Sequence, residues 1–290
     1  MPAIYAHKRF GEMVFDNLDE PLKEAFAPYK ECYLLGFEGP DILFYHKPFK
    51  SNATKKKGST LHLISAETFF LSAAKKISAQ TVPDQKNTPL AAYVAGFICH
   101  FCLDNACHPR IYELEFTGVS HGLIESEFDK FIMKKEGVKV FGNNPARHIK
   151  NENGVAQAAA QTLDVQEKEI KRAIKTIRFI NGAFVCKSKL IHKIIHAFLK
   201  LVNMEAHYGG MLMHHEDDPA CTAIMPDLYA DLKNAVKNTA TLIEEYFQNL
   251  ETTVQTGVVN KFFDKNYTGG ILNEHHQPIR RNDGQETDPA

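Results

Sequence analysis

Residues 88–108 read TPLAAYVAGFICHFCLDNACH, and this stretch decides the fold class of the chain. Thr88 can cap a helix and Pro89 suits its first turn, so a helix is expected to begin here and to stop at Pro109. Nearly every position in the stretch is apolar, which is typical of a helix that other helices bury on all sides. Any polar side chain within it therefore needs a partner inside the protein.

Helical periodicity also dominates on either side of this stretch, and no alternating run is long enough to predict a sheet. The sequence therefore predicts an all-α multi-helix bundle that forms one domain over residues 1–265. A polar tail, 266–290, is expected to be disordered. The other expected helices lie at residues 3–18, 61–80, 120–135, 164–180, 187–203 and 226–250.

Caps and turns complete this outline. Ser120 and Asp164 are the expected caps of the helices that follow them. A turn at residues 36–41 is expected before a short helix from Ile42, which Asp41 can cap. Residues 47–59 are polar, and we expect a plain exposed loop there rather than a lid.

Composition limits the classes of function. The chain has 290 residues and 44% hydrophobic content, which is enough for one substantial core. With 34 basic and 35 acidic residues, the whole molecule has no strong field for nucleic acid or anionic lipid, so phosphate affinity is expected only from a local site. No apolar signal-peptide core and no run of about 18 apolar residues occurs, so we expect a cytoplasmic protein without a transmembrane segment. The six cysteines are then expected to be reduced thiols or metal ligands.

Histidines and carboxylates gather within and just after the apolar stretch. His100, Asp104 and His108 are spaced i, i+4 and i+8, so a helix presents all three on one face. His121 and Glu125 form a second pair at i, i+4. A carboxylate buried between two imidazoles indicates a cation or a dense hydrogen-bond network. Because such pairs on facing helices are how helical bundles hold metal ions, these five residues are candidate ligands.

Other histidines of the chain do not predict a specific metal site. His192 and His196 share the i, i+4 spacing, but they lie on a lysine-rich amphipathic helix without a carboxylate nearby in sequence, so core or surface histidines are favoured there. A later loop rich in His and Asp favours adventitious metal affinity over a specific site. Its members are His207, His214, His215, Asp217 and Asp218.

Cys99, Cys102 and Cys107 raise the alternative of a thiolate zinc site. On a helix, Cys99 and Cys102 point away from His100, so we interpret them as small buried residues. Cys107 lies close to the His100 face and stays a candidate ligand. No second Cys-x2-Cys pair exists to complete a structural zinc site.

The ordered pattern begins well before the apolar stretch, with His7, then Gly39-Pro40-Asp41, then Leu61-His62. Together with His-x3-Asp-x3-His and His-x3-Glu, this order resembles the zinc-dependent phospholipase C family. The S1/P1-type nucleases use a similar trinuclear scaffold. The resemblance covers about residues 1–135 in motif detail and the helical remainder only in character. It implies an all-α fold and hydrolysis of a phosphoester.

The resemblance also implies two to three zinc ions and a set of ligands. That set is His7, Asp41, His62, His100, Asp104, His108, His121 and Glu125. One zinc would be held by His121 and Glu125 together with His108, and Asp104 would bridge a close pair of zinc ions.

Within that pair, His100, His62 and Asp41 would serve one metal and His7 would serve the other. Asp41 is also implied as the catalytic residue, which orients or deprotonates the attacking water. The chemistry is reasonable, because clustered zinc ions lower the pKa of water to about 7 and stabilise both oxygens of the displacement.

Two departures from the secreted members of this family affect details. Those members complete the His7 site with an N-terminal Trp, and this chain contains no Trp. The amine of Pro2, exposed once Met1 is trimmed, or water would take that place, or the third zinc is absent. The His100 to His108 spacing is shorter than in the secreted members and the stretch from Asp41 to His62 is longer, which would reshape the substrate entrance.

Three functions follow from this pattern. The leading hypothesis is phospholipase C-type cleavage of a glycerophospholipid or a related soluble phosphodiester. A nuclease or nucleotidase on the same cluster is the nearest alternative, and nucleic acid would be a partner only in that case. Glu125 in place of Asp favours the phospholipase, and no basic aromatic groove for stacking bases is visible. The third is a non-catalytic metal-binding protein. The oligomeric state is left open.

Overall fold

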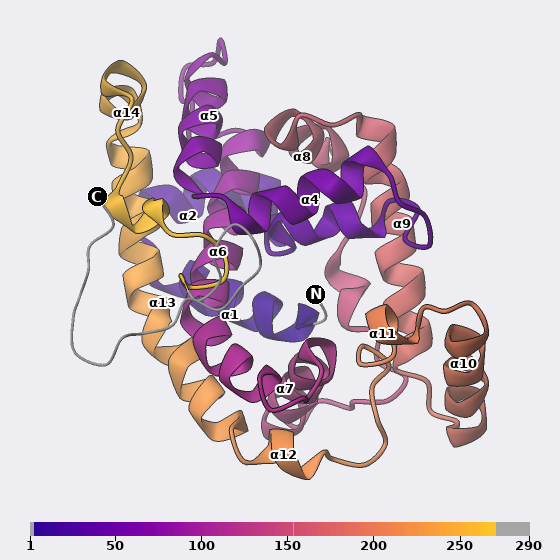
Figure 1. Cartoon of the computed structure of the whole chain (residues 1–290). Helices are drawn as coiled ribbons and strands as arrows, with labels where there is room; N and C mark the ends of the chain where they lie inside the picture. Colours follow the sequence, from indigo (N-terminus) through magenta and orange to yellow (C-terminus); the bar gives the residue numbers. More distant parts are fainter. Residues whose placement is uncertain (1–2, 153, 271–290) are drawn as a thin grey trace.

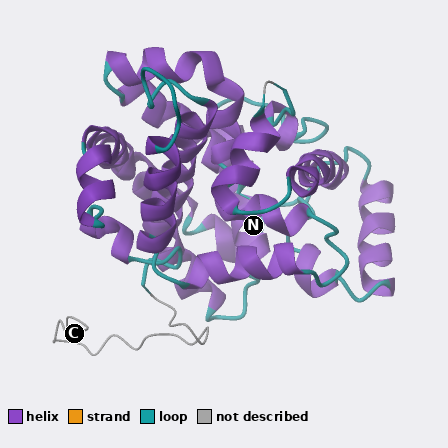
Figure 2. Ribbon diagram, turned by 90° about the horizontal axis from the view of Figure 1, so that it is seen from above, coloured by secondary structure: helices purple, strands orange, loops and turns teal. Residues whose placement is uncertain are grey.

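The computed structural model of the chain describes residues 3–152 and 154–270, except for the side chains of Ala206 and His207. α-Helices and short 3₁₀ helices make up its regular structure, and this part of the chain contains no strand (Figures 1 and 2). The predicted all-α class is confirmed. The predicted tail, 266–290, begins too early, because Tyr267 is buried in the core; residues 271–290 lie outside the described residues.

The apolar stretch forms α6 (Pro89–Glu115), which runs through the middle of the molecule (Figure 1). Thr88 caps it as expected, because its hydroxyl accepts the Ala91 N–H at 3.1 Å. The predicted stop at Pro109 is wrong. Burial of His108 and Ile111 on both sides of Pro109 holds the chain helical and outweighs the one backbone hydrogen bond that proline removes.

α6 is also the one described helix long and apolar enough to cross a membrane by length and composition. However, 89% of its most apolar window is buried inside the molecule, which is typical of the core helix of a folded domain.

Helices from both halves of the chain surround α6. α1 (Ile4–Asn17), α3 (Lys30–Gly36), α7 (His121–Lys135) and α13 (Met225–Gln248) all pack on it. The crossing with α3 depends on two glycines, because a Cβ on Gly36 would lie 2.4 Å from the carbonyl oxygen of Tyr93 and one on Gly96 would lie 2.1 Å from that of Tyr33. This packing brings α1, α6 and α7 together, and these are the helices that carry most of the candidate ligands.

Two predicted segments between α3 and α6 are wrong. Residues 47–59 are not all loop, because α4 (Ala53–Leu63) starts at an Asn52 cap whose side chain accepts the Lys55 N–H at 3.1 Å. The helix predicted over residues 61–80 is interrupted after Leu63, and α5 (Glu67–Ser78) begins after the break. A strong local cap outweighed the polar composition in the first case.

The second half of the chain is also helical. α8 (Val155–Leu163) was not predicted, and α9 (Glu167–Phe184) follows it. Asp164 does not cap α9; it has a positive φ of 49° and ends α8. The predicted helices at 187–203 and 226–250 are present as α10 (Lys189–Leu201) and α13.

Shorter elements complete the chain. They are α2 (Glu20–Phe26), α11 (Glu205–Tyr208), α12 (Pro219–Thr222), α14 (Leu250–Thr256), and the 3₁₀ helices η1 (Ala27–Tyr29), η2 (Gly39–Tyr45), η3 (Pro145–His148) and η4 (Lys261–Asp264).

Candidate metal centre

α6 presents His100, Asp104 and His108 on one face, as their spacing predicts. Asp104 lies between the two histidines: its carboxylate oxygens are 3.2 Å from Nε2 of His100 and 3.8 Å from Nε2 of His108. All three side chains are buried. A carboxylate in the centre of a helical core, with imidazoles above and below it, is the starting point of the site.

α7 supplies the second pair. Ser120 precedes this helix as predicted but makes no side-chain cap hydrogen bond. Glu125 Oε1 lies 3.4 Å from Nε2 of His121 and 3.8 Å from Nε2 of His108. One atom from each of His108, His121 and Glu125 falls within 4.8 Å of the others, so these three side chains form a compact potential ligand group.

The first helix adds His7, whose Nε2 is 3.3 Å from Asp104. The helix carrying it is fixed from α7, because the buried carboxylate of Asp129 accepts the backbone N–H groups of Tyr5 at 3.0 Å and Ala6 at 2.8 Å. These are the otherwise unpaired donors of a helix N-terminus. Asp129 therefore positions the turn that carries His7.

Asp41 and His62 come from η2 and α4. The Asp41 carboxylate lies 2.9 Å from Nε2 of His62 and does not cap the helix that follows, so the capping interpretation is wrong. Gly39 makes the close approach possible, because it has a φ of +48° and a Cβ there would lie 2.3 Å from the His100 ring. His100 belongs to a potential ligand group with these two residues and to another with His7 and Asp104.

Four of the five histidines are anchored through Nδ1. His62 faces the Gly58 carbonyl at 2.8 Å, His100 that of Phe37 at 2.8 Å, and His108 that of Tyr267 at 2.5 Å. Because a carbonyl oxygen only accepts, Nδ1 donates in each case, and the neutral imidazole then has its lone pair on Nε2. His121 Nδ1 lies 3.0 Å from the carboxylate of Glu115. This is the outer-shell pattern of metal-binding histidines.

The electrostatics of the site favour positive charge. Burial opposes ionisation of Asp104, but His100 and His108 hold its pKa well below the usual value. Burial acts in the same way on Asp41, whose pKa is still lowered by the hydrogen bond and charge of His62. Burial lowers the pKa of His100, yet the charge of Asp104 outweighs it and raises that pKa to about 9.

The residues present fit zinc. The donor set is imidazole nitrogen and carboxylate oxygen, which are zinc ligands, and two buried nitrogens, Nδ1 of His7 and Nε2 of His100, make no hydrogen bond within the protein. Such atoms are costly to bury unless something binds them. The three potential ligand groups adjoin one another, because two of them share His100 and the third lies beside Asp104 through His108.

Six of the eight candidate ligands line a cavity of about 450 Å³, and His7 and His100 lie behind them outside its lining. Its lining includes Phe44, Leu63 and Tyr112 as apolar walls and Ser59 and Thr268 as hydroxyls. Carboxylates line it as well, whereas no Lys or Arg of the described residues does. An anionic substrate would therefore be repelled unless bound cations reverse the charge.

The cysteines do not join the site. Cys107, the remaining thiolate candidate, is not part of any potential ligand group among the described residues, and its thiol faces the Leu228 carbonyl at 3.9 Å. Cys99 contacts the hydroxyl of Tyr33 at 3.3 Å, and Cys102 lines a separate cavity beside α13. All the described cysteines are free thiols.

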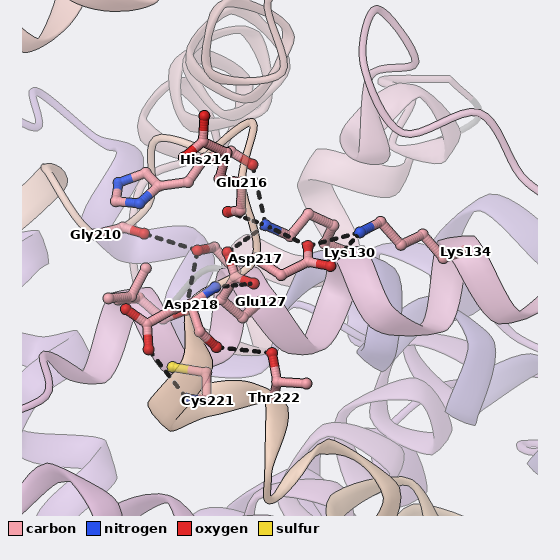
Figure 3. Close-up of polar contacts among 12 residues, drawn as sticks. Glu127, Lys130, Lys134, Gly210, His214, Glu216, Asp217, Asp218, Cys221 and Thr222 are labelled. Atoms are coloured by element: carbon pink, nitrogen blue, oxygen red, sulfur yellow. Dashed lines mark hydrogen bonds and ion pairs between the residues drawn. The ribbon is translucent and has the colours of Figure 1, made fainter.

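The His/Asp-rich loop at 207–218 has its acids occupied elsewhere (Figure 3). Asp217 pairs with Lys134 at 2.6 Å and with the buried Lys130 at 3.1 Å. Asp218 caps α12 by accepting the N–H groups of Ala220 and Cys221. The same Lys130 donates to the carbonyls of His214 and Glu216, so the loop is tied to α7 as a structural element. The side chain of His207 lies outside the described residues.

His192 and His196 also lie away from the cavity. His196 does have a carboxylate partner, which the sequence spacing did not indicate: Glu205 lies 3.1 Å from its Nε2 on the surface. His192 faces the rings of His214 and His215, each 5.7 Å away between centroids.

Two residues of the site were not predicted. Glu115 anchors His121, and its position six residues before that histidine on a different helix gave no periodic signal. Tyr267 supplies the carbonyl for His108 from the far end of the chain, across 159 positions of sequence. Neither contact can be predicted from the sequence.

Comparison with known proteins gives one match. The family model described as zinc dependent phospholipase C matches residues 6–209. No curated protein and no solved structure matches this chain.

Proposed function

Because this chain belongs to the zinc-dependent phospholipase C family, we propose that it is a zinc-dependent phosphodiester hydrolase with phospholipase C-type chemistry. The observation that supports the proposal is the set of side chains that line the cavity. Three potential metal-ligand groups adjoin one another there, and the cavity is lined by several carboxylates but by no lysine or arginine of the described residues. A phosphate binds in such a cavity only if metal ions supply the positive charge.

The geometry suggests how zinc would be held. His108, His121 and Glu125 would hold one ion, and Asp41, His62 and His100 a second. His7 and Asp104, together with His100, would hold a third. Zinc ions there would neutralise the phosphate and lower the pKa of water near them.

The protein's own side chains would then orient the water, hold the imidazoles in place and contact the substrate. Asp41 is held ionised by His62, so its carboxylate can orient water or accept its proton at the edge of the cavity. The anchored Nδ1 atoms keep the imidazoles in place while charge moves through the reaction. Phe44 and Leu63 on the wall give an apolar surface for the glycerol side of a lipid, and they would also fit a smaller soluble phosphodiester.

A nuclease or nucleotidase on the same cluster is the second candidate. Tyr112 and Phe44 line the cavity and offer ring faces on which a base could stack. The absence of lysine and arginine from the described lining argues against binding of a long nucleic acid backbone, which such side chains normally neutralise.

Metal analysis followed by a substrate screen tests the proposal. Protein purified without chelator should contain at least two zinc ions per chain and should lose thermal stability when they are removed, because the buried carboxylates lose their counter-charge. It should then hydrolyse a chromogenic phosphodiester, short-chain phosphatidylcholine or a dinucleotide. Less than one equivalent of zinc after reconstitution would refute the metal site. A fully loaded protein inactive on every phosphoester would instead show a non-catalytic metal-binding protein.

A further inference from the structure

One helix outside the metal centre leaves an apolar face exposed. Along α10, Leu190, Ile194 and Phe198 follow one another at i, i+4 and i+8, and Leu201 continues the same side. These side chains are between 53% and 81% exposed, whereas Leu199 is the only residue buried in this helix. Large apolar side chains gathered on one accessible face mark an interaction surface rather than ordinary scatter.

α10 stands at the rim of the molecule in two perpendicular views (Figures 1 and 2). Among the described helices it packs mainly on the short α11. Its inner side is formed by Leu199 with the partly buried Ile195, His192 and His196. Since the inner side suffices to attach the helix, the exposed apolar side is free to meet a partner.

The positive charge around α10 indicates a negatively charged partner. Lys189, Lys193 and Lys200 form one basic edge beside the apolar face, at i, i+4 and i+11. The surrounding sequence from Ile170 to Met204 contains eight lysines and arginines and no acidic residue. The charge of the whole chain is nearly balanced, so this is a local cationic segment.

Two acidic groups do approach this edge from other elements. Lys189 lies 3.4 Å from Glu216, and Lys200 lies 3.4 Å from Glu205. The side chains of both pairs are 42% to 89% exposed, so water screens the attraction and the lysines can exchange these partners for lipid phosphates. Lys193 has no ion pair among the described residues, and it is available directly.

We propose that α10 is a membrane-docking helix that lies flat on an anionic phospholipid surface. An apolar face flanked by lysines is the pattern of interfacial helices, whose apolar side enters the boundary between head groups and acyl chains while the lysines reach the phosphates. A second copy of this chain is a poorer occupant, because two such faces would bring two rows of lysines together. The proposal goes beyond the proposed hydrolysis and does not depend on turnover.

Sedimentation of the zinc-loaded full chain with vesicles tests this proposal. The protein should bind vesicles of phosphatidylcholine mixed with phosphatidylserine, and binding should weaken as salt is raised and be slight on phosphatidylcholine alone. Phe198→Glu should lower the partition coefficient at least about tenfold, and Lys193→Gln about fivefold. Both positions are exposed on the helix, so circular dichroism and zinc content should stay unchanged.

A matched control is Val258→Glu, which alters a similarly exposed apolar residue after α14 and should leave binding unchanged. Asp104→Asn in the metal centre should also bind vesicles normally, which separates docking from hydrolysis. The proposal is overturned if the wild type does not bind at low salt, or if Val258→Glu weakens binding as much as Phe198→Glu. A dimer that Phe198→Glu dissociates would assign the face to a second copy instead.

Discussion

Two sets of histidines in this chain look alike in sequence and differ in structure. In the metal centre, five imidazoles each direct Nε2 at a carboxylate, and four are fixed through Nδ1. Around α10, the ring of His192 meets those of His214 and His215, but the described residues form no ligand group there. Spacing at i, i+4 occurs in both sets.

Buried carboxylates make the difference, because the acid that pairs with a histidine of α10, Glu205 with His196, lies on the surface. In the His/Asp-rich loop at 207–218, Asp217 is paired with two lysines and Asp218 caps a helix, so neither acid is free for a cation (Figure 3). In the metal centre, Asp104 and Glu125 face imidazoles. We therefore expect a metal site only where an acid is directed into the histidine cluster, and not from the histidine spacing alone.

The substitution with the largest expected effect on the metal centre is Asp104→Asn. The amide keeps the size of the side chain but removes the charge that would offset two cations, so we expect loss of the His7 and His100 zinc ions and a fall in turnover of about a thousandfold or more. The group of His108, His121 and Glu125 should keep its ion. Elemental analysis and phosphodiester hydrolysis measure both effects. Unchanged zinc stoichiometry in this variant would show that Asp104 does not bridge metals.

Asp41→Asn should have a smaller effect that separates rate from binding. If Asp41 orients or deprotonates water, the variant should fold and keep most of its zinc while losing about a hundredfold in turnover. The measurements are zinc content, melting temperature and kcat on a chromogenic phosphodiester. Because Asp41 makes no capping hydrogen bond, loss of a helix cap cannot explain a lower rate. An equally active variant would remove this residue from the mechanism.

Much of the fold could be predicted because its cause is local. The Thr88 cap, the apolar run after it and the Ser188 cap of α10 lie within a few residues of the helices they start. The errors arose where two effects compete and the sequence does not show which of them is stronger. Packing carried α6 through Pro109, and a single Asn52 side chain turned a polar stretch into α4.

The candidate site could be predicted only where residues share a helix or a known order. His100, Asp104 and His108 follow from helical geometry, whereas His7 and His62 came from family resemblance alone, and the structure places them beside that face. Glu115 and the Tyr267 carbonyl were missed, because a contact between distant segments leaves no periodic pattern in either. Outer-shell partners are set by tertiary packing.

Glu115→Gln sharpens the comparison at one of these missed contacts. Glu115 holds His121 through Nδ1, so the variant should bind zinc at the His108, His121 and Glu125 group about ten to a hundred times more weakly. Competition with a fluorescent chelator measures this change. Glu113→Gln, on the same helix, is the matched control and should leave the affinity unchanged. Equal affinities in both variants would mean that the Glu115 contact does not tune the metal.

The smallest expected effect is at the other histidine set. His192→Ala combined with His215→Ala removes two imidazoles whose Nε2 atoms are buried without a hydrogen-bond partner, so they resemble ligands by that criterion alone. Among the described residues neither ring pairs with a carboxylate, and Asp217 of the neighbouring loop is held by Lys134 and Lys130. We therefore expect zinc stoichiometry and turnover equal to those of the wild type, whereas His62→Ala measured in parallel should lose zinc. Loss of a zinc equivalent from the double variant would show that three clustered histidines bind metal without a carboxylate, and the distinction between the two sets would then rest on burial instead of charge.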